Sequence, residues 1–137
     1  MKGWLTLAAA ALLAGCATSP IPAEQADHVP DERLMLHQET PTGPYGTLTV
    51  TRDTGITGSA CNARLSIDGE LAAEIAVGET ASFFLSPGEH VLGVITGVGL
   101  CPERLKETAA TIIEGEAKRY RISLDLNGSI DLSRTAF

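Results

Sequence analysis

The amino-acid sequence predicts an all-β protein, an antiparallel β-sandwich or small barrel of about seven or eight strands. Three observations lead to this prediction. From Gly46 onward, apolar and polar residues alternate with period 2 in short runs. Turns that contain Gly or Pro separate these runs, and no stretch shows a convincing long helical pattern. Because aromatic residues make up only 4% of the chain, the core must consist mainly of Val, Ile, Leu and Ala.

The expected strands cover short segments joined by turns. The dipeptides Asp68–Gly69 and Asn127–Gly128 are typical of hairpin turns, because Gly accepts a positive φ without penalty. Both faces of Phe83–Leu85 and of Val91–Ile95 are apolar, so we place these two strands centrally and join them by a hairpin at Ser86–Glu89. Hairpins are expected to put sequential strands side by side. In chain order, the predicted strands are 46–51, 63–68, 71–75, 80–85, 90–96, 108–113, 120–124 and 130–132.

One of these segments, 103–113, has a mixed composition. Lys106 and Glu107 favour a helix, whereas the β-branched Ile112 and Ile113 favour a strand. A helix here is the main alternative to the all-β prediction. We expect a strand over its second half, 108–113, because that run is rich in β-branched residues.

The first fifteen residues differ from the rest of the chain. Lys2 gives a positive start, an apolar run extends from Trp4 to Leu13, and Leu13-Ala14-Gly15-Cys16 then places two small residues before a cysteine. The apolar run is about half of the ~20 residues that span a bilayer, so it suits a cleaved signal better than a transmembrane helix. The pattern resembles the signal peptide and cleavage box of bacterial lipoproteins. An ordinary secretory signal with a chance cysteine, or a buried helix, is the alternative.

This resemblance implies where in the cell the protein is located. Residues 1–15 would be removed, and Cys16 would become the N-terminus and carry acyl chains such as palmitate on a diacylglyceryl thioether. Two or more acyl chains hold a protein firmly at a membrane, whereas one binds marginally. Ala17 follows the cysteine, and in enterobacterial lipoproteins an Asp at that place retains the protein at the inner membrane. The resemblance therefore favours the cell envelope, at the periplasmic face of the outer membrane.

Residues 16–45 have the composition of a linker. Proline lacks an N–H group and restricts the residue before it, so a proline-rich stretch suits neither a helix nor a central strand. We expect a lipidated Cys16 on a flexible tether of roughly 30 Å, followed by the sandwich domain over 46–137. Segment 31–38 is expected to dock locally, as one helical turn capped by Asp31 or as a short strand. The five prolines of this stretch are Pro20, Pro22, Pro30, Pro41 and Pro44.

Cys61 and Cys101 remain once Cys16 is assigned to lipid. An exported compartment oxidises thiols, and an even number of remaining cysteines suggests a disulfide. If the strands alternate in direction, Cys61 precedes one strand and Cys101 follows another that ends on the same side of the sheet. We predict a disulfide between them, with free or metal-binding thiols as the alternative.

Composition and motifs argue against several functions. The formal charge is −7, and without Lys2 it becomes −8, from 9 basic and 17 acidic side chains. An acidic body argues against a nucleic-acid partner and against electrostatic adsorption to anionic lipid. The histidines His28, His37 and His90 have no spaced His or Cys partner for zinc, and no known catalytic motif occurs. We expect no catalytic residues, no metal and no cofactor.

For three polar features we favour an interpretation that gives them no binding or catalytic function. His90 is expected to be a surface residue beside a turn. Arg119 and Arg121, with Lys118 nearby, are expected to form a solvated face, with a small anion-binding patch as the alternative. Loop 54–59 is expected to be a connector, although its small polar residues would also suit a ligand.

Two stretches carry recognisable turn motifs. Leu65–Glu70 is a strand that ends in Asp-Gly, and Phe83–Leu92 contains Pro-Gly-Glu-His before an apolar strand. Together they resemble PEGA-type β-domains and related small proteobacterial lipoproteins of unknown function. The resemblance is clearest over residues 65–92. It implies a transthyretin-like or immunoglobulin-like sandwich, and it supplies no catalytic residues.

These observations predict a non-enzymatic lipoprotein of the cell envelope. It would be a structural or binding module, held at the membrane by its lipid anchor, with an envelope protein or the cell wall as its partner. A periplasmic enzyme or enzyme-accessory protein with an unrecognised site is one alternative. A carrier of a small apolar ligand is another.

Overall fold

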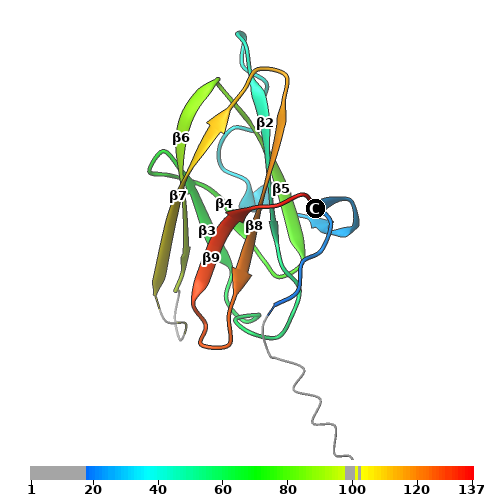
Figure 1. The fold of residues 1–137 in the computed structure, drawn as a ribbon, viewed down its shortest axis with the longest axis vertical. Helices are drawn as coiled ribbons and strands as arrows, with labels where there is room; N and C mark the ends of the chain where they lie inside the picture. Colours follow the sequence, from blue (N-terminus) through cyan, green and yellow to red (C-terminus); the bar gives the residue numbers. More distant parts are fainter. Residues whose placement is uncertain (1–17, 98–100, 102) are drawn as a thin grey trace, which may run out of the picture.

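The computed structural model describes residues 18–97, 101 and 103–137, and these form two facing β-sheets (Figure 1). The first sheet has the strand order β1-β5-β2-β8-β9, and the second has the order β4-β3-β6-β7. The predicted signal peptide and Cys16 lie outside the described residues. The elements are η1 (Ala23–Gln25), β1 (Asp27–His28), η2 (Asp31–Arg33), β2 (Gly46–Arg52), β3 (Ala63–Ile67), β4 (Glu70–Ile75), β5 (Glu79–Leu85), β6 (Gly88–Thr96), β7 (Arg104–Ile112), β8 (Ala117–Leu124) and β9 (Ile130–Arg134).

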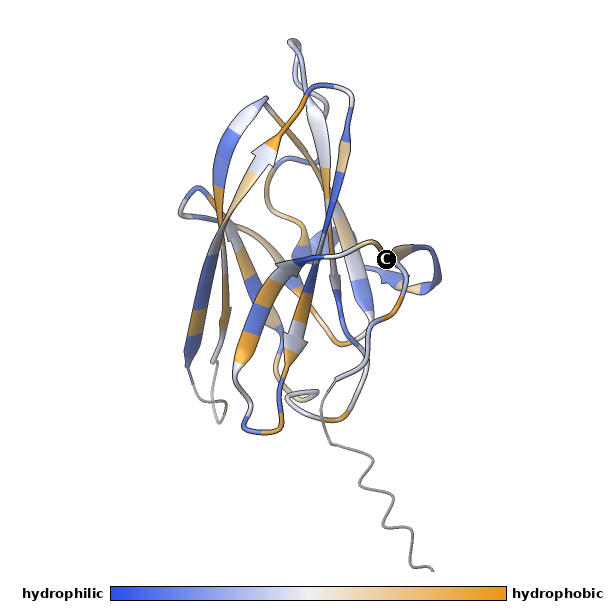
Figure 2. Ribbon diagram, viewed as in Figure 1, coloured by the Kyte–Doolittle hydropathy of each residue, from blue (hydrophilic) through white to orange (hydrophobic). Residues whose placement is uncertain are grey.

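The predicted all-β sandwich is confirmed, and its core lies between the sheets. Along β3, Ala63, Leu65 and Ile67 are fully buried. Arg64, between the first two of them, is exposed. Figure 2 shows the same alternation of hydrophobic and hydrophilic residues along β9. The strands from β2 to β9 therefore each contribute an apolar face to a core that is mainly aliphatic. The larger buried apolar residues are Leu48, Val50, Leu65, Ile67, Ile75, Phe83, Leu85, Leu92, Val94, Ile112, Tyr120, Ile122 and Leu132.

The ambiguous segment is a strand, as predicted, and it begins earlier than we expected. β7 starts at Arg104 and pairs antiparallel with β6 along its whole length, from Thr96↔Arg104 to Gly88↔Ile112. Lys106 and Glu107 are good helix formers, but cross-strand pairing along nine residues outweighs their small intrinsic preference.

The connectivity differs from a simple succession of hairpins. β3–β4, β6–β7 and β8–β9 are hairpins, but β5 and β6 lie in different sheets, so the expected hairpin at Ser86–Glu89 is wrong. A tight turn reverses the chain, but it does not decide whether the two arms bond to each other. Here both arms pack apolar residues on the same core from opposite sides. Both strands are interior in their sheets, as predicted, because β5 lies between β1 and β2, and β6 between β3 and β7.

The described part of the proline-rich segment lies along the sandwich. β1 pairs in parallel with β5, the Val29 side chain is buried, and Leu34 forms an isolated bridge with Ala73. Extended backbone next to proline leaves other N–H groups free to bond a sheet edge, and Val29 N donates to the Thr80 carbonyl at 3.0 Å. From Thr18 onward, the chain is therefore held, in contrast to the flexible coil that the composition suggested.

The expected docking of segment 31–38 takes a combined form. η2 is a single 3₁₀ turn, Leu34 follows it with the bridge to β4, and Leu36 packs against the core. The residue that caps η2 is Pro30, with no side-chain cap bond, so the expected cap by Asp31 is wrong.

Candidate functional site

The sandwich has two ends with different contents. β2 and β8 run in parallel, so both lead from one end to the other. We call the end that holds Thr18, loop 53–62 and loop 125–129 the disulfide end, and the end that holds loop 42–46 and turn 113–116 the groove end. Figure 1 shows that the described chain begins at the disulfide end, near the loop that joins β8 to β9.

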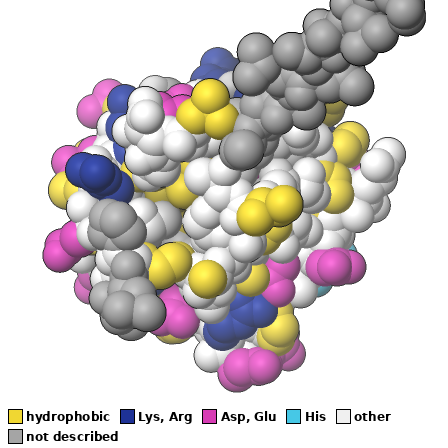
Figure 3. Space-filling model, turned by 90° about the horizontal axis from the view of Figure 1, so that it is seen from below, with side chains coloured by type: hydrophobic (Ala, Val, Ile, Leu, Met, Phe, Trp, Pro, Cys, Tyr) yellow, Lys and Arg dark blue, Asp and Glu magenta, His cyan; other side chains and the backbone are white. Residues whose placement is uncertain are grey.

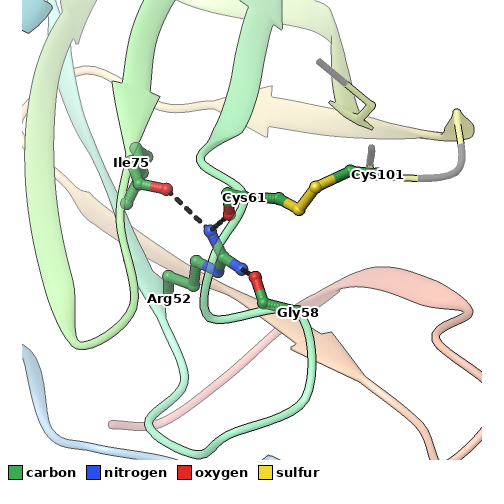
Figure 4. The surroundings of a disulfide bond; sticks show 5 residues. All are labelled: Arg52, Gly58, Cys61, Ile75 and Cys101. Carbon is green, nitrogen blue, oxygen red and sulfur yellow. Dashed lines mark hydrogen bonds between the residues drawn. A yellow bond between two sulfur atoms is a disulfide. The ribbon is translucent and has the colours of Figure 1, made fainter. Parts of the chain in front are cut away.

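Cys61 and Cys101 meet at the disulfide end. Their Cα atoms are 6.3 Å apart, within the range for a disulfide, and the structure joins the two residues (Figure 4). Cys61 precedes β3 and Cys101 follows β6, and these two strands are antiparallel neighbours with Arg64 opposite Ile95. The predicted proximity of the two cysteines is therefore confirmed, and so is the alternation of strand direction on which it depended.

Arg52 ends β2 beneath this disulfide and is only 1% exposed. Its Nη1 donates to the carbonyl oxygens of Cys61 at 2.5 Å and Ile75 at 3.0 Å, and its Nη2 donates to the Gly58 carbonyl at 2.8 Å (Figure 4). Burial lowers the pKa of Arg52, and the charge of Glu79 opposes that shift. One buried guanidinium thus holds loop 53–62 against β4 through backbone groups.

Asp53, the next residue, is also buried and holds the start of the described chain. Its carboxylate accepts a bond from Thr18 Oγ1 at 2.9 Å and a bidentate pair from Arg121, whose Nε lies 3.0 Å from Oδ1. The hydrogen bond to Asp53 raises the pKa of Arg121. Thr18 Oγ1 also accepts a bond from Leu124 N at 3.0 Å. Thr18 is therefore tied to the start of loop 53–62 and to β8 at the same time.

Two further ion pairs hold the proline-rich segment to the sandwich. Arg33 binds Glu79 through both terminal nitrogens, at 2.8 and 2.6 Å, and also donates to the Glu74 carbonyl at 3.0 Å. The bond to Glu79 raises the pKa of Arg33. Glu24 pairs with Arg119 on β8. Because Arg119 and Arg121 both pair with carboxylates, the alternative of a small anion-binding patch on this face loses its support.

His90 is held by both of its ring nitrogens. Nδ1 lies 2.6 Å from Asp68 Oδ2, and Nε2 lies 2.7 Å from the Ser86 carbonyl. Asp68 also accepts a bond from Val91 N at 2.9 Å and begins the β3–β4 turn at φ 51°. The side chain of His90 is 11% exposed, so the expected surface residue is in fact packed between two turns. A general base needs a free ring nitrogen, and here both are engaged.

The Asp68–His90 pair should make the stability of the protein depend on pH. Burial opposes the charge on His90, but its bonds to Ser86 and Asp68 outweigh this and raise its pKa, while the bond from His90 lowers the pKa of Asp68. His90 therefore contributes its full share to the free energy of unfolding when the pH is below its ordinary pKa of 6.5. This share is lost as the pH rises through the higher pKa that His90 has in the folded protein. We expect the pair to contribute about 1 kcal/mol or less, because Asp68 is half exposed.

Urea denaturation at about pH 5.5 and about pH 8 checks this sign. The wild-type protein should lose more stability between these values than the His90→Gln variant does. The matched control is His28→Gln, which removes an exposed imidazole on β1. A change that occurs only in His90→Gln is then assigned to the Asp68–His90 pair. Equal losses in the wild-type protein and in His90→Gln would refute the assignment.

Two recesses lie at opposite ends. A small apolar pocket of about 140 Å³ lies beside the disulfide, lined by Gly58, Cys61, Thr96, Cys101, Leu124 and Gly128. A larger open groove of about 670 Å³ lies at the groove end, between residues 42–47 and 114–117. Tyr45 lies in this groove and packs edge-on against Phe84. A side chain on Gly46 would come within 2.5 Å of the Ile113 carbonyl, so only Gly allows this approach of loop and turn.

The sequence did not indicate the part played by Thr18, Arg52 and Asp53. The available signal was that Arg52 and Asp53 interrupt the alternation at the end of β2, where a charged pair follows five residues of regular pattern. Among the described residues, no group of three or more His, Cys, Asp or Glu is placed to hold a metal ion. Within the same part of the chain, no helix has the length and apolar character to cross a membrane.

A comparison with models of known protein families and with curated proteins finds no match to this chain.

Proposed function

We propose that this protein is a non-enzymatic lipoprotein of the cell envelope, a structural or binding module that is held at the membrane through an acylated Cys16. The observation that carries the proposal is the position of Thr18. The Leu13-Ala14-Gly15-Cys16 box ends two residues before it, and Thr18 is fixed to Asp53 and Leu124 by four hydrogen bonds. The folded body thus starts immediately after the cysteine that would carry the lipid.

The use of the charged groups also supports a module rather than an enzyme. The ion pairs Arg33–Glu79 and Arg119–Glu24 tie the N-terminal segment to the sandwich. The pair Arg121–Asp53 joins β8 to the start of loop 53–62, where Thr18 binds. The Asp68–His90 pair joins two turns and leaves neither ring nitrogen free. These groups stabilise the fold, and a second function in proton transfer would require them to break those bonds.

The recesses favour a binding module over a carrier of an apolar ligand. Sites for small molecules have volumes of about 300–1,000 Å³ and are mostly apolar. The apolar pocket beside the disulfide has a volume of only about 140 Å³. The larger groove is open, partly polar, and carries Glu114 and Glu116. It lies at the end opposite Thr18, so it would face away from the membrane, where an envelope protein or the cell wall could reach it.

The anchor is tested by Cys16→Ser in the full chain. We expect the wild-type protein to incorporate labelled fatty acid, to lose residues 1–15 and to sediment with membranes. The Cys16→Ser variant should remain an unprocessed precursor without label. The measurements are fatty-acid labelling and mass spectrometry of the N-terminus.

The matched control is Cys101→Ser, which removes a different cysteine and should leave the labelling intact. If the Cys16→Ser variant is still processed and still carries label, the anchor is not at Cys16 and the proposed function fails.

A further inference from the structure

We infer that the disulfide end rests on the bilayer, with the side chains of Ile56 and Leu126 inserted among the lipids beside the acylated Cys16. This inference rests on the proposed lipid anchor and adds an orientation and a lipid contact to it. The occupant of this apolar surface would be the phospholipid bilayer that holds the acyl chains.

The first step is the position of the two loops relative to the start of the described chain. Thr18 N donates to the Leu124 carbonyl at 3.2 Å, and Ser19 forms an antiparallel bridge with Thr54. A side chain on Gly55 would come within 3.1 Å of Thr18 Cα. Loops 53–62 and 125–129 therefore flank Thr18 from two sides.

The second step is what these loops expose. Ile56 lies one residue beyond Gly55 and is 88% exposed, and Leu126 lies two residues beyond Leu124 and is 62% exposed. Large apolar side chains at such exposure have no partner within the sandwich. Figure 3, which views this end directly, shows hydrophobic side chains across the face and charged side chains mainly toward its rim.

The third step is reach. Cys16 precedes Thr18 by two residues, and even fully extended chain covers only about 7 Å over that distance. The acyl chains on Cys16 would lie in the hydrocarbon, so Thr18 cannot be far from the headgroups. Apolar side chains of interfacial proteins enter about 5–10 Å into the boundary between headgroups and acyl chains. The loops beside Thr18 are therefore at the depth where Ile56 and Leu126 would meet lipid.

The charges at this end are compatible with that contact. Asp53 is buried and paired with Arg121. Asp125, next to Leu126, is exposed, and its Oδ1 accepts bonds from the backbone N–H groups of Asn127 and Ser129. A carboxylate in that position would lie in the headgroup layer, while the neighbouring Leu126 side chain reaches further.

The test uses tryptophan as a depth probe. Trp4 is the single tryptophan of the sequence and lies in the predicted signal peptide, so the mature protein would contain none. The lipidated mature variants Ile56→Trp, Leu126→Trp and Ile113→Trp are reconstituted into vesicles of phosphatidylethanolamine and phosphatidylglycerol that contain phosphatidylcholine with brominated acyl chains. Ile113 is the matched control, because it is exposed at the groove end of the same sandwich.

We expect brominated lipid to reduce the tryptophan fluorescence of Ile56→Trp and Leu126→Trp about twofold, because both side chains would lie at the depth of an interfacial residue. The fluorescence of Ile113→Trp should not change. Flotation of the same samples reports the anchor separately. Vesicles that float with the protein but quench none of the variants, or all three equally, would overturn the orientation while the anchor stands. Protein that carries no lipid and does not float would overturn the anchor and the orientation together.

Discussion

Replacing Arg52 by methionine should lower the free energy of unfolding by about 3 kcal/mol, because three backbone carbonyls lose a buried charged donor. Two effects compete in this substitution. Methionine fills a similar space and removes the cost of a buried charge, which in some proteins makes such a replacement neutral or favourable. Against this, hydrogen bonds to a charged donor contribute about 1.5–3 kcal/mol each. Arg52 makes three of them, so we expect the loss to dominate.

Chemical denaturation measures this change in the free energy of unfolding. Two further variants serve as a comparison and a control. Arg52→Lys keeps the charge but has one nitrogen in place of the planar fork, so it should recover only part of the loss. The matched control is Arg64→Met on β3 of the facing sheet, whose side chain is 45% exposed and which should change stability by no more than about 0.5 kcal/mol. Equal unfolding midpoints for Arg52→Met and Arg64→Met would show that the network contributes nothing.

The strands of this protein could be predicted because their alternation is local. Ala63, Leu65 and Ile67 point to one face whatever the rest of the chain does, and the same is true of Tyr120, Ile122 and Leu124. The location of Cys61 and Cys101 at the same end of the domain was also predictable, because it depends only on how many times the chain reverses between them. Neither inference needed to know which strands are neighbours.

Pairing between strands could not be predicted from the same pattern. An apolar strand such as β5 or β6 satisfies its alternation equally in either sheet, and the parallel pairing of β2 with β8 joins segments far apart in sequence. Segment 31–38 was expected to dock, but the docking of the chain before it was hidden for a related reason. Its apolar anchor Val29 is a single apolar residue between His28 and Pro30, so no period marks it.

The network at the disulfide end shows why the candidate site itself was missed. Arg52 and Asp53 look like a surface pair in sequence, yet both are 1% exposed because their partners come from loop 53–62, β4, Arg121 and Thr18. One further long-range contact, which the sequence analysis did not predict, joins two of its turn motifs. The Asp-Gly turn and the Pro-Gly-Glu-His turn meet through Asp68 and His90, although each motif describes only its own turn.

Removing the disulfide should cost about 3–4 kcal/mol in the Cys61→Ala/Cys101→Ala double variant, because the bond closes a loop with a sequence separation of 40. Since small domains have only about 5–15 kcal/mol of stability, the variant should remain folded but unfold at distinctly lower denaturant. Thiol counting gives an independent check. The unreduced, denatured mature protein should react with no alkylating reagent at these two positions, and full alkylation of both would refute the bond.

The same variants test whether the disulfide and Arg52 act as one unit. Arg52 donates to the carbonyl of Cys61 itself, so both fix the same loop, and residues that share a structural element couple by about 0.5–3 kcal/mol. Once the disulfide is absent, loop 53–62 is less ordered in the native state, and Arg52→Met should then cost less than it does in the oxidised protein. A double-mutant cycle over Arg52→Met and the cysteine pair measures this difference. Strict additivity would mean that Arg52 orders the loop without help from the disulfide, and that the two features stabilise this end of the sandwich independently.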